Sequence, residues 1–351
     1  MGRQEMARVD TKRLQRAFDV ARLYVEQGEV PSAVLAVGNR EGLVRCEAFS
    51  GQDAAAPDSI YLLASISKPI TATALMQLVE DGLLVLSEPL TRYIPEFAQP
   101  AKPTVTAHHI LTHTSGMEEK AYWDTLGASL APIEAFVRAA CCAGLHFQPG
   151  SRYEYCTLSF FVLAELIARL SGMPYVDYLR ERVLAPLGMV DTSFDPGAEN
   201  PRAMPVRNFL PDPALAMWKA LAVPGGGLWS TAADLVAFGR AFLNGGRAAT
   251  GARLLAPATI DLMTRDHVAG LVEMVEGQPR PAHYGLGWGK GPLRGHMPGS
   301  AQAFEHSGAT GTLLLVDPEW DLVYVFLTNR WEASDQARLG ALQAVYAALE
   351  R

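Results

Sequence analysis

Ser65 and Lys68 are the first residues whose types and spacing suggest chemistry, a Ser-x-x-Lys pair. An apolar stretch at 61–63 precedes the pair, and a helical pattern runs on through 72–79. Residues three apart share a helix face, so the lysine amine can approach the serine hydroxyl, and the helix N-terminus favours negative charge on that oxygen. A neutral Lys68 would accept the proton of a nucleophilic Ser65, which requires burial that lowers the lysine pKa.

Other patterns argue against competing chemistries. The Ser-x-x-Lys spacing alone is also typical of a capped helix start followed by a surface lysine. No Gly-x-Ser-x-Gly elbow of the α/β-hydrolases occurs, and the three glycines at 225–227 lack the Gly-Lys-Ser/Thr of a phosphate loop. His109 and His113 could share a helix face, but Ile110 stands where a zincin needs glutamate. We therefore expect no metal, no nucleotide and no other cofactor.

The elements that must hold Ser65 and Lys68 indicate a sheet built from both ends of the chain. Apolar spacing predicts a helix over 11–27, and helical periods dominate 66–264. Strand patterns precede and follow that region, at 32–37, 43–50, 284–289, 303–306, 312–316 and 321–328, before a closing helix over 335–350.

This order of elements predicts a mixed α/β (α+β) fold. Residues 1–65 and 270–351 should form an antiparallel sheet domain flanked by N- and C-terminal helices, and residues 66–269 a mainly helical inserted domain. Such an arrangement leaves a cleft between the two parts. We expect the active site in that cleft.

The composition excludes several classes of protein. The 351 residues are 49% hydrophobic, enough for a large core, and 30 basic against 37 acidic side chains give a net charge of −7. Such a surface repels phosphate backbones, so nucleic acid is not an expected partner. The first residues lack an apolar signal core, and the most apolar run, 158–170, is too short for a bilayer and contains two charges. Four cysteines do not make a disulfide scaffold. We expect a cytoplasmic protein with no membrane partner.

Two further segments complete the pattern around Ser65. A Pro149-Gly150 turn leads to Tyr155 just before the apolar helix that begins near Leu158, and His306-Ser307-Gly308-Ala309 ends a strand. Together with Ser65 and Lys68, these segments resemble the serine β-lactamase and penicillin-binding-protein superfamily, in the branch of class C β-lactamases, D-amino-acid peptidases and family VIII esterases. The resemblance spans nearly the whole chain, with further matching motifs at 111–116, 186–189, 191–193, 225–231 and 284–288.

The resemblance implies the β-lactamase/transpeptidase-like fold and acyl transfer without a cofactor. Ser65 would be the nucleophile, Lys68 its proton acceptor, and Tyr155, rather than Tyr153, the shuttle that protonates the leaving group. In this superfamily the oxyanion hole is made by backbone N–H groups, which here belong to Ser65 and Ala309. The partner would be a small ester or amide molecule.

Two departures from the family pattern bear on the substrate. Thr157 stands where relatives often have an asparagine that binds an acylamino group, and His306-Ser307-Gly308 replaces Lys-Thr-Gly. An imidazole with an ordinary pKa of about 6.5 is mostly neutral at about pH 7, so His306 supplies no permanent counter-charge for a substrate carboxylate. We therefore predict a carboxylesterase acting on small or short-chain esters. The alternatives are a β-lactamase, a D-amino-acid peptidase or amidase, and a non-catalytic binding or assembly protein.

Overall fold

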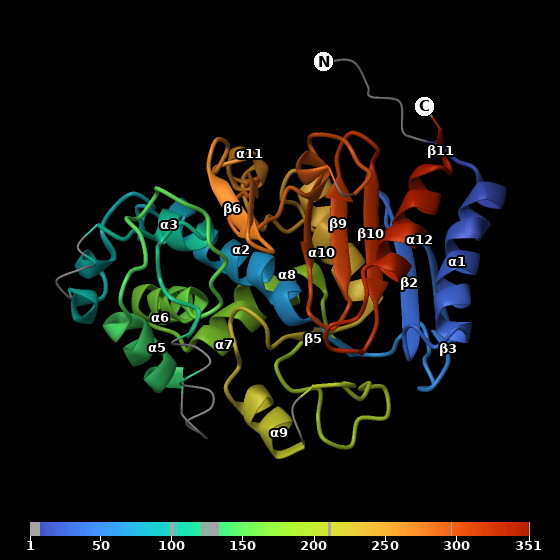
Figure 1. The fold of residues 1–351 in the computed structure, drawn as a ribbon, viewed down its shortest axis with the longest axis horizontal. Coiled ribbons are helices and arrows are strands. Elements are labelled where there is room, and N and C mark those ends of the chain that lie inside the picture. Colours follow the sequence, from blue (N-terminus) through green and yellow to red (C-terminus); the bar gives the residue numbers. More distant parts are fainter. Residues whose placement is uncertain are drawn as a thin grey trace.

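The computed structural model of the chain describes residues 8–98, 102, 104–120, 124, 133–209, 212–295 and 297–350. Its centre is a five-stranded antiparallel sheet with the strand order β3-β2-β10-β9-β8 (Figure 1). The strands are β2 (Ser32–Gly38), β3 (Leu43–Ser50), β8 (Phe304–Ser307), β9 (Leu313–Asp317) and β10 (Leu322–Leu327). Because β2 pairs with β10, both ends of the chain share one sheet, as the sequence predicts.

Helices cover both faces of this sheet. On one face α1 (Thr11–Glu26) and α12 (Gln336–Tyr346) pack against each other and against inward residues such as Leu35 and Tyr324. On the other face, α10 (Ala232–Leu243) packs on β2, β9 and β10, whose residues such as Val34 and Val325 join the main core. Strands that are buried on both faces have continuous apolar sequences. This explains why β2 and β10 contain no charged residue.

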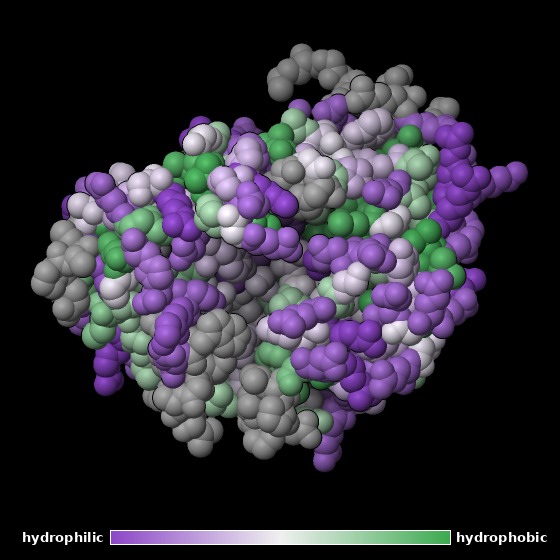
Figure 2. All heavy atoms as spheres, in the orientation of Figure 1, coloured by the Kyte–Doolittle hydropathy of each residue, from purple (hydrophilic) through white to green (hydrophobic). Residues whose placement is uncertain are grey.

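A mainly helical region lies beside the sheet, at the left of Figure 1. It begins with α2 (Ser67–Glu80), whose residues are almost all buried and which packs on α6 (Ser159–Ser171). The other helices of the middle of the chain are α3 (Ala107–Leu111), α5 (Ile133–Cys142), α7 (Tyr175–Leu179), α8 (Ala185–Leu187), α9 (Asp212–Ala220) and α11 (Pro257–Thr264). The surface is hollowed between the helical region and the sheet (Figure 2).

Several local elements differ from the sequence predictions. The strand predicted over 284–289 is a turn closed by a bridge between Tyr284 and Gly289, because Gly287 takes a φ of +78° that ends extended structure. The closing helix ends at Tyr346, and β11 (Leu349–Glu350) then pairs with β1 (Arg8–Val9). The apolar stretch at 61–63 contains the short strand β4 (Tyr61–Leu62), while β5 (Trp229–Ser230), β6 (Val272–Val275) and β7 (Gln278–Pro281) were not predicted.

Hydrophilic residues cover most of the face seen in Figure 2, with apolar residues in small groups. In the part of the chain that the structure describes, no single helix is long and apolar enough to cross a membrane. The segments Ser159–Ser171 and Tyr175–Leu187 meet those limits as a pair, but they are bent by 82° against each other.

Candidate active site

Ser65 lies in a single turn of 3₁₀ helix, η1 (Ala64–Ile66), between β4 and α2. The residue before it, Ala64, has a φ of +49°, a left-handed conformation that costs energy in a residue with a side chain. The hydroxyl of Ser67 secures this turn by donating to the Ala64 carbonyl at 2.8 Å and accepting from the Leu228 N–H at 3.0 Å. The surrounding hydrogen bonds thus hold Ser65, which is partly exposed, in a fixed strained turn.

The sheet side also holds this turn. Thr310 donates its hydroxyl to the Leu62 carbonyl at 2.7 Å, and Thr312 donates to the Leu63 carbonyl at 2.9 Å. Gly308 lies so close that a Cβ there would be 2.1 Å from the Leu63 oxygen. The end of β8 and the start of β9 are therefore fastened to the segment that carries Ser65.

Lys68 is fully buried, with 0% of its surface exposed, and its amine lies 3.2 Å from the Ser65 Oγ. The amine also donates to the Gly225 carbonyl at 2.7 Å and to the Thr157 hydroxyl at 3.4 Å. Burial lowers the pKa of Lys68 from 10.5 to about 7, although the carboxylate of Glu119 acts in the opposite direction. The burial that the Ser-x-x-Lys hypothesis required is present, and it favours the neutral amine of Lys68.

Tyr155 completes the group: it lines the same pocket as Ser65, the Ser65 side chain acts on the pKa of its hydroxyl, and its ring centre lies 4.7 Å from the Lys68 Nζ. His113 stacks on the tyrosine ring with centroids 4.2 Å apart, and its Nδ1 accepts the N–H of Cys156 at 3.1 Å. Burial raises the pKa of Tyr155 well above its ordinary value, so the phenol keeps its proton. Lys68 is thus the group able to take a proton, and Tyr155 a group able to donate one.

Tyr153 and Tyr155 both line the pocket at Ser65, so lining alone does not distinguish the two tyrosines. The two rings nevertheless have different surroundings. Tyr153 packs in a small cluster with Val268 and Tyr284, and its N–H donates to the Val272 carbonyl of β6 at 3.3 Å. The Ser65 side chain acts on the pKa of Tyr155, whose ring also lies against the Lys68 amine.

The pocket at Ser65 has a volume of about 280 Å³. Its lining residues come from both regions of the molecule: Ser65, Tyr153, Tyr155, Tyr284, Gly289, Glu305, His306, Ser307, Gly308, Ala309 and Arg338. The nucleophile therefore opens into a polar cavity large enough for a small acyl group and its leaving group.

The peptide between Gly308 and Ala309 is fixed in orientation beside Ser65. Its carbonyl oxygen accepts the N–H of Gly311 at 2.9 Å and a guanidinium N–H of Arg338 at 3.4 Å. Because a trans peptide is planar, the N–H of Ala309 must point away from that oxygen. The oxyanion-hole role that the family resemblance implies for Ser65 and Ala309 stays a prediction.

His306 is buried at the end of β8 and has a hydrogen bond on each ring nitrogen. Nδ1 lies 2.9 Å from the Ser307 carbonyl, which can only accept, so Nδ1 carries a proton. A neutral ring then uses Nε2 to accept the hydroxyl proton of Tyr284, which lies 2.9 Å away. Both partners suit the neutral imidazole expected from the sequence.

Arg338 of α12 is a site residue that the sequence reasoning missed, and it changes the charge of the pocket. Its guanidinium donates to the carbonyls of Gly308 and Thr312 and pairs with Asp335. The expectation about His306 concerned that residue alone and did not include the guanidinium of Arg338, which also lines the pocket. Arg338 lies in the first turn of α12, where the helix dipole disfavours a positive charge. This unusual position was the sequence signal that could have indicated a role for Arg338.

Thr157 lies beside the catalytic candidates but not among the pocket-lining residues. Its hydroxyl accepts from Lys68, and its N–H donates to the carboxylate of Glu119, a second residue that the sequence reasoning missed. The resemblance aligns Thr157 with an asparagine that binds an acylamino group, but the Thr157 hydroxyl contacts Lys68.

The histidines considered for metal binding have other partners. His108 bonds His267 at 3.2 Å between ring nitrogens, and His109 contacts Thr106 as part of a helix cap. Among the described residues, no group of three or more His, Cys, Asp or Glu could hold a metal ion.

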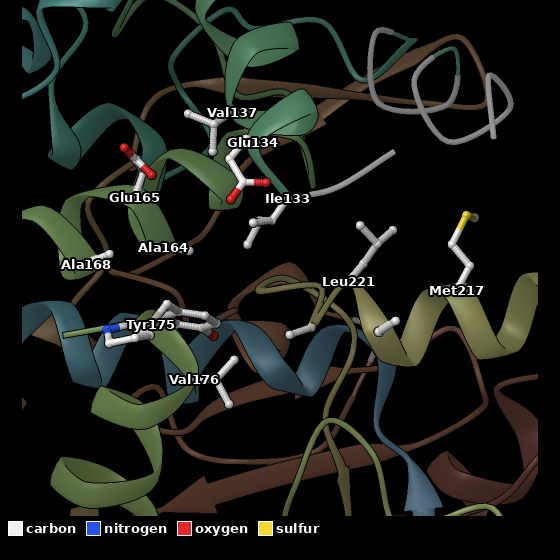
Figure 3. A pocket seen from close by; sticks show the side chains of 13 residues that line it. Ile133, Glu134, Val137, Ala164, Glu165, Ala168, Tyr175, Val176, Met217 and Leu221 are labelled. Atoms are coloured by element: carbon white, nitrogen blue, oxygen red, sulfur yellow. The ribbon is translucent and has the colours of Figure 1, made fainter. Parts of the chain in front are cut away.

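A larger cavity, of about 550 Å³, lies away from Ser65. Figure 3 shows its mainly apolar lining, with Ile133 from α5, Tyr175 from α7 and Leu221 just after α9. None of its lining residues belongs to the Ser65, Lys68 and Tyr155 group. Size alone would therefore select the wrong cavity as the site of chemistry.

Comparison with known proteins defines the class. Residues 18–348 match the Beta-lactamase family, so the chain belongs to that family. It is 30% identical to Protein Rv1367c of Mycobacterium tuberculosis, with 86% of each chain covered. It is also 32% identical to Penicillin-binding protein 4 of Amycolatopsis lactamdurans (90% of this chain, 84% of that protein) and 33% identical to Esterase EstB of Burkholderia gladioli (57% and 56%).

Solved structures agree on the fold. A penicillin-binding protein homologue from Caulobacter crescentus superimposes with a TM-score of 0.81 at 23% identity, covering 97% of this chain and 99% of that one. A family VIII carboxylesterase superimposes with a TM-score of 0.78 at 20% identity, over 97% and 99% of the two chains. The chain therefore has the β-lactamase/transpeptidase fold, and it is a serine β-lactamase-like hydrolase whose relatives include esterases and penicillin-binding proteins.

Proposed function

We propose that this protein is a carboxylesterase that hydrolyses small or short-chain esters through an acyl-enzyme on Ser65. The observation that carries the proposal is the group formed by Ser65, the fully buried Lys68 and the protonated Tyr155, opening into a small polar pocket. Such a group supplies a nucleophile, a proton acceptor and a proton donor.

In the acylation step, the Ser65 Oγ attacks the ester carbonyl carbon while its proton passes to the Lys68 Nζ. The carbonyl oxygen becomes an oxyanion that accepts from the N–H groups of Ser65 and Ala309. The bond to the alkoxy leaving group then breaks, and the hydroxyl of Tyr155 protonates the departing oxygen. Tyr155 regains a proton from the Lys68 ammonium, so the site returns to its starting charge.

Deacylation follows the same route in reverse. A water molecule gives a proton through Tyr155 to Lys68 and attacks the acyl carbon. The ester bond to Ser65 breaks, and the serine oxygen takes back a proton as the carboxylic acid leaves.

Two features support an ester rather than a β-lactam or peptide as the substrate. His306 has partners that suit a neutral ring, and Thr157 faces Lys68 instead of the pocket. The family VIII carboxylesterase and Esterase EstB among the similar proteins add support from relatives of that name.

The test combines mass spectrometry with kinetics. Incubation with p-nitrophenyl butyrate should give one acyl adduct on the wild-type chain and none on Ser65→Ala, and kcat/KM for this ester should exceed that for nitrocefin. An adduct that persists in Ser65→Ala would contradict the nucleophile. A nitrocefin kcat/KM equal to that of the ester would contradict the substrate class.

Arg338 favours one second candidate, a β-lactamase or D-amino-acid peptidase whose substrates carry a carboxylate. Its guanidinium is a permanent cation in the pocket, and Penicillin-binding protein 4 is a relative of that name. Three acceptors already occupy this guanidinium, which is why the ester stands first. Faster turnover of D-alanyl amides than of aryl esters would place the peptidase or amidase before the esterase. Failure of a fluorophosphonate to label Ser65 would favour the other alternative, a non-catalytic binding protein.

A further inference from the structure

Glu119 lies in the segment after α3, and its carboxylate reaches the N-terminus of α6. It accepts the backbone N–H groups of Thr157 and Leu158 and interacts with the thiol of Cys156. The residue that precedes α6, Leu158, has an apolar side chain and cannot cap the helix itself. The carboxylate therefore satisfies N–H groups that the start of α6 leaves open, where negative charge is favoured.

The hydrogen bond to Thr157 ties this carboxylate to the catalytic group. The Thr157 hydroxyl lies 3.4 Å from the Lys68 Nζ, and Tyr155 is two residues earlier in the same segment. A shift of this backbone would move the tyrosine hydroxyl relative to Ser65. Glu119 is thus placed to fix the distance between the proton donor and the proton acceptor.

The surroundings of Lys68 make the charge of Glu119 important as well. The amine faces Ser65, Thr157, the Gly225 carbonyl and the rings of Tyr155 and Phe160, and none of these carries a full charge when Tyr155 is protonated. The ionisable groups that act on it are the carboxyl of Glu119 and the thiol of Cys156. Burial raises the pKa of Cys156, so this thiol stays neutral.

A buried ammonium is costly unless an opposite charge offsets it. Lys68 becomes such an ammonium at the moment it takes the proton of Ser65. Burial raises the pKa of Glu119, while Lys68 and the Thr157 N–H act to lower it, so the ammonium and the backbone contact both favour the charged carboxylate that serves as the counter-charge.

We propose that Glu119 is a positioning residue that holds the Tyr155–Thr157 backbone against Lys68 and stabilises the ammonium formed when Lys68 accepts the Ser65 proton. The proposal rests on the serine hydrolase function above. It assigns no contact between Glu119 and the substrate, because the carboxylate is not among the pocket-lining residues.

The test is the pH dependence of Ser65 labelling by a fluorophosphonate, together with ester kcat/KM, in the wild type and in Glu119→Gln. The amide of glutamine can still accept the two N–H groups but carries no charge. Loss of the carboxylate should lower the pKa of Lys68, so the acid limb of both profiles should move to lower pH by about one unit. The plateau rate should fall by about tenfold, because the ammonium loses its counter-charge.

Glu118→Gln is the matched control, since Glu118 is the neighbouring acid and pairs with the exposed His146 instead of the site. Its profiles should superimpose on those of the wild type. Glu119→Ala should show the same shift of the acid limb with a further loss of kcat, because it also removes the acceptor for the α6 N–H groups.

The outcomes separate this inference from the proposed function. Identical acid limbs in the wild type and Glu119→Gln, or a shift to higher pH, overturn the role of Glu119 while Ser65 is still labelled. A lower melting temperature with an unchanged acid limb shows a merely structural residue and also overturns it. Absence of labelling at Ser65 in the wild type overturns the proposed function itself, and this inference with it.

Discussion

Lys68 and Lys102 are among the buried lysines of the described chain, and their surroundings differ in an instructive way. Lys68 has 0% and Lys102 1% of its surface exposed, and burial lowers the pKa of the first to about 7 and of the second to about 8. Judged by burial and pKa alone, either could be a proton acceptor in catalysis.

Their partners separate them. The amine of Lys102 donates to the carbonyls of Ala140 and Cys141 at 2.7 and 2.6 Å, at the C-terminal end of α5, where the helix dipole favours a cation. Lys68 is the second residue of α2, where the dipole disfavours a cation, and one of its partners is the Ser65 hydroxyl. A buried lysine therefore indicates a catalytic site only where a nucleophile lies beside it and its helix favours the neutral form.

The largest expected effect tests this distinction through activity. Lys68→Met keeps the length and volume of the side chain but removes the proton acceptor of Ser65. We expect ester kcat to fall by about 10⁴, at the upper end of the range for a general base. Stopped assays with p-nitrophenyl butyrate measure it.

Lys102→Met is the matched control. It leaves two carbonyls at the end of α5 without their donor, which should lower the free energy of unfolding by about 1–3 kcal/mol. Its kcat should stay within about twofold of the wild type, since a surface or structural change away from the site does not alter the chemical barrier. A loss of kcat comparable to that of Lys68→Met would show that burial alone, rather than the neighbouring nucleophile, sets the role.

The next effect concerns the proton donor. Tyr155→Phe removes the hydroxyl proposed to donate the proton beside Ser65, and kcat should fall by about 10²–10³ while KM changes little. Tyr153→Phe keeps the packing of a ring in the same pocket and should change kcat by less than about threefold. Both rings line the pocket, so the two variants can be compared directly. Equal losses of kcat would contradict the assignment of the proton transfer to Tyr155.

The sequence predicted the parts of this site that depend on local spacing. The positions of Ser65 and Lys68 three residues apart fixed their contact, and the strand patterns located the sheet edge that carries His306 to Ala309. The antiparallel sheet with its two terminal helices was confirmed for the same reason, since regular periods report on regular elements.

What the sequence did not reveal depends on contacts between distant segments. Arg338 enters the pocket because α12 packs across the sheet, and Glu119 reaches Thr157 across 38 residues. Likewise, nothing in the spacing of Thr310 and Thr312 indicated that their hydroxyls fasten the turn before Ser65. These contacts follow from tertiary packing, which periodicity does not encode.

The smallest expected effect returns to the two lysines and concerns stability. In the unfolded chain Lys68 should titrate at its ordinary pKa of 10.5, while in the folded protein its pKa is about 7. Between these values the unfolded state binds more protons, so the burial of Lys68 costs most below about pH 7 and progressively less as the pH rises toward about 10.5. Replacing the buried ammonium by an apolar side chain of similar volume removes the cost of taking that charge out of water. Lys68→Met should therefore be more stable than the wild type at about pH 6, and this gain should shrink by about pH 9.5, as measured by urea unfolding at both values.

Lys102→Met should lose stability at both pH values, because the lysine amine donates to carbonyls that methionine leaves without a donor. A Lys68→Met variant that is less stable than the wild type at about pH 6, or whose gain does not change with pH, would mean that the Gly225 and Ser65 contacts outweigh the cost of burying the amine.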